Sequence, residues 1–442
     1  MTHLDSTWYE RYIAISRTVG ETYELLEPTP ELLAARYTDF VQSDYSLNPD
    51  LTTDKPQRES LSQARAQALQ LQADIQHSES RSLIRESYLP AIDALLDNIS
   101  LIIAGATGDT RTYRSTCERL YGQPNHDIFA AACAWIRADA LATSVDGSSH
   151  LATLRHNVLA ALPSVDADYS VLIPSEQVFA DVRQHHTEYY RQLFGLKGFP
   201  VEPYIDEATG NEICRRVLTN IGSDYVLAPS DNNLWAILPS RKRVVYPSGY
   251  RLDRDEFVGI VCHEIGSHVL EAVNGASSPL LLLGAGLAGY ERGNEGRAFL
   301  REQIVYDHER TFLRQFSWEY IILLHVATSL AAGAYHHPHS FSELYHTLYH
   351  LYYFWRERRM PHATNNEAFT RDEAWYLAVR ILKGTPGNGS AAYLKDSVYL
   401  EGNVRCWQLA AEDPSSILLG DQGKFDPTNP SHRALVLSLT MR

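Results

Sequence analysis

The chain has 442 residues, of which 44% are apolar and 21% are charged. This balance is typical of globular proteins and excludes wholesale disorder. The formal net charge of −15 disfavours non-specific binding to nucleic acid or to anionic lipid, so we expect neither as a partner. Five cysteines without a CxxC pair, and an N-terminal segment unlike a secretory signal, predict a cytoplasmic protein without a disulfide framework.

The first third of the chain is predicted to be helical, because apolar residues recur there at spacings of three and four. The predicted helical segments are residues 8–37, 60–103, 111–120 and 127–141, within an N-terminal helical region over residues 1–160. A short strand is predicted at 169–173, and a helix is predicted to begin at Glu176 and to end at Phe194.

Three short runs rich in β-branched and aromatic residues predict a small sheet, at 214–219, 234–238 and 243–246. From residue 253 onward the pattern is almost entirely helical. This order predicts an α+β fold that is mostly helical, with a second domain over residues 161–442. The apolar stretches at 279–290 and 320–335 are shorter than the roughly 20 residues that span a bilayer, so we expect buried helices or core segments and no membrane contact.

Residues 262–268 read CHEIGSH and carry the strongest chemical signal. His263, Glu264 and His268 lie in an apolar segment that begins after Asp253, a helix N-cap residue, and closes at Asn274-Gly275. A glutamate on an apolar helix is costly to bury without a cation nearby. This combination predicts a metal site with two histidine ligands and Glu264 as the general base on the attacking water.

The spacing of the two histidines is unusual for such a site. Histidines four residues apart share a helix face, whereas five residues place them about 140° apart on a regular α-helix. A π-turn would bring the two rings back together, and Gly266 would supply backbone freedom there. We therefore predict a π-bulge between His263 and His268.

A catalytic zinc ion takes three protein ligands and keeps one open position. Glu295, Glu271, Glu291 and His308 are the candidates for the third ligand. A second histidine pair, His346 and His350, has the four-residue spacing, but tyrosines surround it and no carboxylate accompanies it at a base position. Aromatic packing is the favoured interpretation of that pair.

Several motifs together resemble the tyrosine carboxypeptidase family of zinc metallopeptidases, which includes the microtubule-associated tyrosine carboxypeptidases and bacterial proteins named for a QEGLA motif. They are HEIGSH at 263–268, Asn274-Gly275, Glu295-Gly296 with Ala298, and a block with Arg380, Gly384 and KDSVYLEG at 395–402. The resemblance runs from about residue 60 to the C-terminus. It implies a zincin-like catalytic domain with His263, His268 and Glu295 as zinc ligands and Glu264 as the base.

The chain departs from that family at residues 294–298, which read NEGRA. Asn294 and Arg297 replace the commoner residues, so we expect the pocket beside the metal to differ from that of the family. The resemblance also places Arg380, Lys395 and Tyr399 at the substrate, because a carboxypeptidase needs a cation for the free α-carboxylate.

The expected function is therefore zinc-dependent removal of a C-terminal residue, aromatic or acidic, from a peptide or protein. The strand at 243–246 is the expected edge along which an extended peptide lies. Two alternatives remain open: another zinc amide hydrolase, including an endopeptidase, and a non-catalytic regulatory metal-binding protein. Glu264 favours the enzymes, because a structural metal site needs no base.

Overall fold

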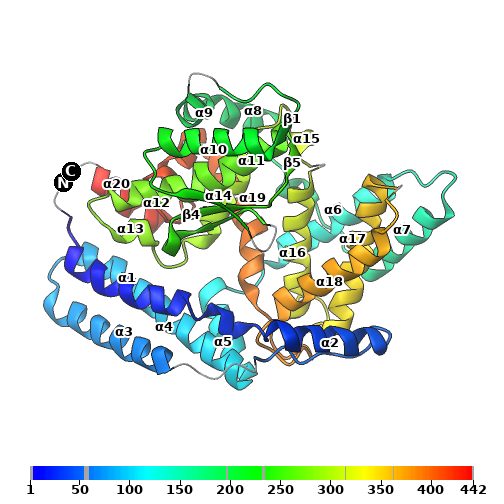
Figure 1. The fold of residues 1–442 in the computed structure, drawn as a ribbon, viewed down its shortest axis with the longest axis horizontal. Coiled ribbons are helices and arrows are strands. Elements are labelled where there is room, and N and C mark those ends of the chain that lie inside the picture. The colour runs from blue at the N-terminus through cyan, green and yellow to red at the C-terminus, as the bar shows by residue number, and fades with distance from the viewer. Residues whose placement is uncertain are drawn as a thin grey trace.

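The computed structural model describes residues 3–53, 59–195, 198–230, 234–313, 315–361 and 363–440. The protein is mostly helical with a few short strands, as predicted (Figure 1). The N-terminal helices are α1 Ser6–Gly20, α2 Pro30–Gln42, α3 Glu59–Ser78, α4 Ser82–Thr107, α5 Thr110–Tyr121, α6 His126–Ala142 and α7 Ser149–Ala161.

The middle of the chain contains the strands and three helices. The strands are β1 Tyr204–Asp206, β2 Val226–Pro229, β3 Ala236–Leu238, β4 Arg243–Tyr246 and β5 Arg251–Asp253, and the helices are α8 Glu176–His185, α9 Thr187–Phe194 and α10 Glu207–Asn220. One sheet has the order β2-β4-β3, with β2 parallel and β3 antiparallel to β4, and β1 pairs with β5 in a second, antiparallel ribbon.

The C-terminal half is helical from residue 254. It contains α11 Arg254–His263, a π-helix η5 Glu264–Val269, α12 Leu270–Ala276, α13 Leu282–Ala285, α14 Glu291–Gln303, α15 Glu309–Phe312, α16 Phe316–Ala332, α17 Phe341–Arg359, α18 Asn366–Leu382, α19 Ser397–Glu412 and α20 Pro430–Thr440. Short 3₁₀ helices are η1 Tyr23–Leu26, η2 Tyr169–Leu172, η4 Pro239–Arg241, η6 Leu394–Asp396 and η7 Pro414–Gln422.

Three local predictions were wrong. Residues 214–219 lie in α10, where Cys214, Val217 and Leu218 are buried on one helical face, so their spacing outweighs the β-branched composition. Residues 169–172 form a 3₁₀ helix instead of a strand, because the Asp168 side chain accepts a hydrogen bond from the Ser170 backbone. The helix predicted from Glu176 is interrupted at His186, which separates α8 from α9.

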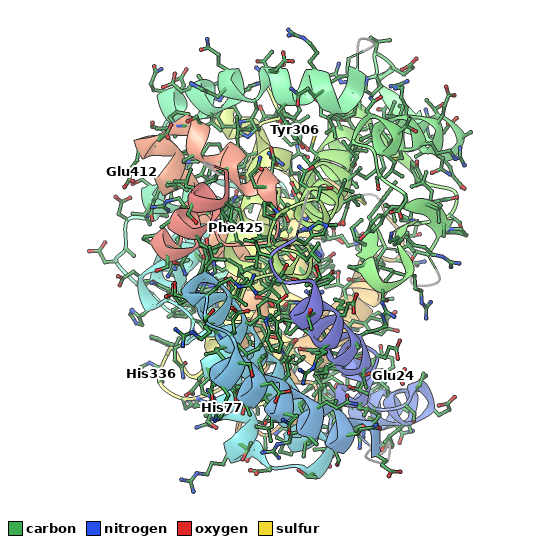
Figure 2. The ribbon with its side chains drawn as sticks, turned by 90° about the vertical axis from the view of Figure 1, so that its left-hand side faces the viewer. Glu24, His77, Tyr306, His336, Glu412 and Phe425 are labelled. Atoms are coloured by element: carbon green, nitrogen blue, oxygen red, sulfur yellow. The ribbon has the colours of Figure 1, made fainter. Side chains whose placement is uncertain are left out.

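Two apolar cores hold the molecule together. The larger core draws on residues from Tyr12 to Leu439 and so includes side chains from both predicted domains. The smaller core surrounds the middle strands and includes Phe257 and Val261 of α11 and Ile265 of the π-helix η5. In Figure 1 the helices α1, α3, α4 and α5 form a layer below the part that holds α10, α11 and α14. Figure 2 shows the same arrangement from the side, with Glu24 and His77 below Phe425 and Tyr306.

Among the described helices, α4 alone is long and apolar enough to pass a length and composition test for a membrane span. Its side chains Ile84, Ile92 and Ile99 are fully buried in the larger core, and the helix packs on α3 and α5. These contacts are those of a core helix.

Candidate metal centre

The CHEIGSH motif lies in a continuous helical segment over residues 254–276, which changes from an α-helix to a π-helix at the histidines. The Asp253 carboxylate caps α11 by accepting a hydrogen bond from the Asp255 backbone, and the helix then runs into the π-helix over Glu264–Val269. The π-bulge predicted from the five-residue spacing is thereby confirmed. It brings the His263 and His268 rings to a centroid separation of 5.2 Å.

Gly266 is needed in the π-helix for space more than for backbone freedom. Its φ angle is not in the left-handed region, but a Cβ atom there would lie 2.1 Å from the Tyr189 hydroxyl. That hydroxyl donates to the Gly266 carbonyl at 2.9 Å, and the Arg301 guanidinium donates to the same carbonyl at 2.8 Å. Arg301 also lies 4.0 Å from the Tyr189 ring centroid. Two side chains from outside the segment therefore hold the carbonyl at its centre.

Glu295 of α14 completes the cluster. Its Oε2 atom lies 3.8 Å from His263 Nε2 and 3.5 Å from His268 Nε2. The three ligand atoms lie within 4.8 Å of one another, and this is the one such group of three among the described residues. All three side chains are largely buried, with relative exposures between 12% and 19%.

Glu302 is a second carboxylate at the site, which the sequence analysis missed. Its Oε2 atom lies 3.1 Å from Nδ1 of His263, so it orients the imidazole with Nε2 toward the cluster. Glu302 follows Glu295 by seven residues, or two helical turns, and this spacing on one face of α14 was the available signal.

The titratable groups of the cluster shift one another's pKa. Burial alone would lower the pKa of His263, but the hydrogen bond that its Nδ1–H donates to Glu302, together with the nearby charges of Glu264 and Glu295, raises it to about 9. Burial tends to raise the pKa of Glu295, yet His268 and His263 lower it to about 2. Burial raises the pKa of Glu264 above its ordinary value. Three carboxylates thus face two imidazoles in a buried site.

The other candidates for the third ligand are placed elsewhere. Glu271 is buried in ion-pair contact with Arg297, Glu291 lines a separate cavity, and His308 lies 3.9 Å from Glu176. His346 packs edge-on against the Tyr345 ring at 5.4 Å, in agreement with the aromatic interpretation. Cys262, beside the first ligand, is fully buried, and burial raises the pKa of its thiol.

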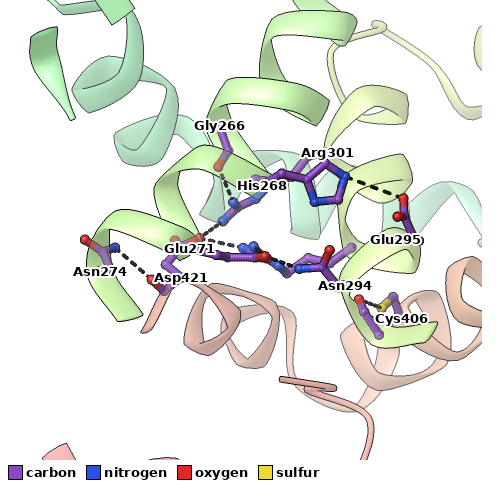
Figure 3. A network of polar contacts seen from close by, with 12 residues as sticks. Gly266, His268, Glu271, Asn274, Asn294, Glu295, Arg301, Cys406 and Asp421 are labelled. Atoms are coloured by element: carbon purple, nitrogen blue, oxygen red, sulfur yellow. Dashed lines mark hydrogen bonds and ion pairs between the residues drawn. The ribbon is translucent and has the colours of Figure 1, made fainter. Parts of the chain in front are cut away.

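Asn294 belongs to a buried polar network with Glu271, Arg301 and Asp421, whose members Figure 3 labels, and Arg297 joins this network through its ion pairs. Asn294 donates to Glu271, and Arg297 contacts both Glu271 and Asp421. Asp421 also pairs with Arg301 at 2.6 Å. Neither Asn294 nor Arg297 lines the 610 Å³ or the 650 Å³ cavity described below. Their positions therefore do not support the expectation that they reshape the pocket.

A cavity of about 610 Å³ opens on His263 and Glu264. Glu256, Glu302 and Glu319 contribute carboxylates to its walls, and Arg356 and Arg359 contribute cations. Its aromatic walls are Trp235, Phe299, Tyr306, Phe316, Tyr320, Tyr352 and Trp355. Glu264 and His263 therefore face a space large enough for a peptide segment.

A second cavity, of about 650 Å³, contains the predicted substrate residues Arg380, Lys395 and Tyr399. The Tyr399 ring packs on Phe299 at 6.0 Å, and Phe299 packs on His263 at 4.7 Å, so two aromatic rings link this cavity to the cluster. Arg380 is already paired, with two hydrogen bonds of 2.7 and 2.8 Å to Asp396.

The ammonium group of Lys395, by contrast, forms no ion pair or side-chain hydrogen bond with the described residues. Its charge adds to the lowering of the Glu295 pKa by the two histidines, and it opposes the rise that burial causes in the pKa of Glu291. Lys424, a residue without a sequence signal, is buried nearby, and burial lowers the pKa of its ammonium while Glu295 and Glu291 oppose that shift.

The prediction that an extended peptide lies along the strand at 243–246, which is β4, needs one correction. β4 is the central strand of its sheet, so both of its edges are occupied by β2 and β3. The strand that lies against the π-helix is β3, and Trp235, directly before it, lines the 610 Å³ cavity. β3 has a neighbour on one side within the described sheet, so it is the edge strand that lies against the π-helix.

Comparison with known proteins adds no assignment. No protein-family model matches the chain, and no curated protein matches it.

Proposed function

We propose that the protein is a zinc-dependent carboxypeptidase, a zincin-like member of the tyrosine carboxypeptidase family that acts in the cytoplasm. The observation that carries the proposal is the convergence of His263, His268 and Glu295, with Glu264 at the wall of the adjoining cavity. A structural metal site would have no use for an open cavity and a free carboxylate beside it.

The donor set fits zinc. Two imidazole nitrogens and one carboxylate oxygen are a common catalytic zinc site, and a carboxylate behind one imidazole is its usual support. Glu302 supplies that support to His263. A zinc ion bound there would act as a Lewis acid on the scissile carbonyl and activate water.

Glu264, Glu302 and the aromatic walls of the cavity each have a separate role in the proposed hydrolysis. Glu264 accepts a proton from the attacking water and passes it to the nitrogen of the leaving residue, for which a carboxylate with a pKa above its usual range is suited. Glu302 keeps the His263 ring in one orientation. Aromatic side chains of the 610 Å³ cavity exclude water from the peptide.

The choice of a carboxypeptidase over an endopeptidase rests on Lys395 and Tyr399, which line the 650 Å³ cavity. Since Arg380 is paired with Asp396, we assign the C-terminal carboxylate of the substrate to Lys395, with the Tyr399 hydroxyl beside it. The preceding residues of the substrate would extend along the edge of β3. An endopeptidase is the alternative, and it would need no cation at this position.

Cleavage of matched peptides with a free or an amidated C-terminus tests the proposal. Losing one charge-assisted contact costs about 2 kcal/mol, so the free acid should be cleaved roughly 30-fold faster. Lys395→Gln should abolish this preference, whereas Lys383→Gln, which removes a lysine paired with Glu27, should keep it. Equal cleavage of acid and amide by the wild type would favour an endopeptidase.

A further inference from the structure

The 650 Å³ cavity that Tyr399 lines has six charged side chains in its walls. Four of them form two pairs: Arg380 with Asp396 at 2.7 Å, and Lys383 with Glu27 at 3.2 Å. The remaining two are Glu291 and Lys395. Neither forms an ion pair within 4 Å, or a hydrogen bond to another side chain, among the described residues.

These two unpaired groups have opposite charges and line the same cavity. Burial raises the pKa of Glu291 above its ordinary value, and the charge of Lys395 opposes that rise. Glu291 begins α14 and Lys395 lies in η6, so the two groups come from different walls. A cavity that offers one carboxylate and one ammonium matches a ligand with one ammonium and one carboxylate.

We infer that this cavity binds a zwitterionic α-amino acid, with Lys395 contacting its carboxylate and Glu291 contacting its ammonium. Tyrosine rings, among them Tyr12, Tyr121 and Tyr290, form walls for the side chain of the ligand. The volume lies within the range of roughly 300–1,000 Å³ that is usual for small-molecule sites.

The inference deepens the proposed function and rests on it for its biological meaning. Hydrolysis converts the amide nitrogen of the last residue into an amine, which takes up a proton at neutral pH. The released residue would then match Glu291, one helical turn before Glu295, while its carboxylate stays on Lys395. The cavity would hold the product before release, so free amino acids should inhibit peptide cleavage.

Calorimetric titration of the full chain tests this site without relying on catalysis. The probes are L-phenylalanine, L-leucine, L-lysine and L-glutamate, which represent four classes of side chain. For the amino acid that binds best, the N-acetyl and the amide derivatives should each bind at least roughly tenfold more weakly, because each has lost one charge.

Two variants should give a crossed pattern. Glu291→Gln should weaken binding of the free amino acid but not of its N-acetyl derivative, and Lys395→Gln should weaken the free amino acid but not its amide. Glu27→Gln and Lys383→Gln, which change paired charges of the same cavity, are the matched controls and should keep the wild-type preference. Circular dichroism and thermal unfolding verify that each variant is folded.

Two results would overturn the inference: no binding of any of the four amino acids at millimolar concentration, or equal binding of free and capped forms. Persistence of binding in His263→Ala would support the cavity as the site, whereas its loss there would assign the ligand to the metal. Peptide cleavage without amino-acid binding would refute this inference alone. Amino-acid binding without cleavage would support it and refute the proposed function.

Discussion

The substitution Gly266→Ala perturbs the π-helix at its centre. The new Cβ would lie 2.1 Å from the Tyr189 hydroxyl and 2.9 Å from a methyl group of Leu193, so one of these groups must move. Tyr189 cannot move freely, because its hydroxyl bonds the Gly266 carbonyl and its ring packs under Arg301. If Tyr189 moves away from the new Cβ, its hydroxyl therefore also loses the hydrogen bond to the Gly266 carbonyl.

The magnitude follows from three contributions. Overpacking costs about 1–3 kcal/mol, and the hydrogen bond at risk contributes about 1 kcal/mol. Alanine has a better helix propensity than glycine by about 1 kcal/mol, which offsets part of this cost. Gly266→Ala should therefore lower the free energy of unfolding by about 1–3 kcal/mol. Because His268 follows two residues later, zinc affinity should fall at least roughly tenfold.

Tyr189→Phe provides the decisive comparison. It removes the clashing oxygen, so in the double variant with Gly266→Ala the loss should be smaller than the sum of the two single losses by about 1–2 kcal/mol. Gly20→Ala is the matched control, since no atom lies within 4 Å of its added Cβ. Urea unfolding and zinc competition with a chromophoric chelator measure both quantities. Strictly additive losses, or a Gly266→Ala variant with wild-type zinc affinity, would refute the steric argument.

Three further predictions concern the cluster and the core. His263→Ala should abolish stoichiometric zinc binding, measured by elemental analysis, whereas the matched His346→Ala should retain it; zinc loss in both would contradict the ligand assignment. Glu302→Gln should weaken zinc binding by about 10- to 100-fold, because His263 loses its oriented partner; an unchanged affinity in chelator competition would exclude that role. Burial, with the nearby Arg301 charge, lowers the pKa of His186 to about 3. Below pH about 6.5 the unfolded chain therefore binds a proton at His186, and the folded chain does not bind it until the pH falls to about 3. Stability should therefore fall as the pH decreases from about 6.5 to 3, by up to about 1.4 kcal/mol per pH unit. Urea unfolding of His186→Gln should show a shallower slope, and an identical slope would contradict this assignment.

The sequence predicted the local features of the site because they depend on short spacings. The five-residue spacing of His263 and His268 predicted a π-turn, and that turn is present. The reason for Gly266 was not predictable, because the space it leaves is taken by Tyr189, 77 residues earlier. Likewise nothing local in the sequence pairs Arg297 with Asp421, 124 residues later.

The errors in the fold have a similar physical origin. The run at 214–219 was assigned to a strand from its β-branched composition, although its buried residues recur at helical spacing. The placement of β4 in the centre of its sheet depends on β2 and β3, whose pairing no local pattern encodes. Composition described the segments correctly as apolar but did not determine their partners.

The most direct test of the account is the comparison of wild type and Glu264→Gln on one free-acid peptide. Glutamine keeps the size of the side chain but cannot accept a proton from water, so the variant should hold one zinc per chain and lose at least roughly 100-fold in cleavage rate. Mass spectrometry of the peptide and elemental analysis of the protein measure both quantities on the same sample. The account predicts removal of a single C-terminal residue by the wild type alone. A peptide left intact by the zinc-loaded wild type, or shortened equally fast by Glu264→Gln, would contradict it.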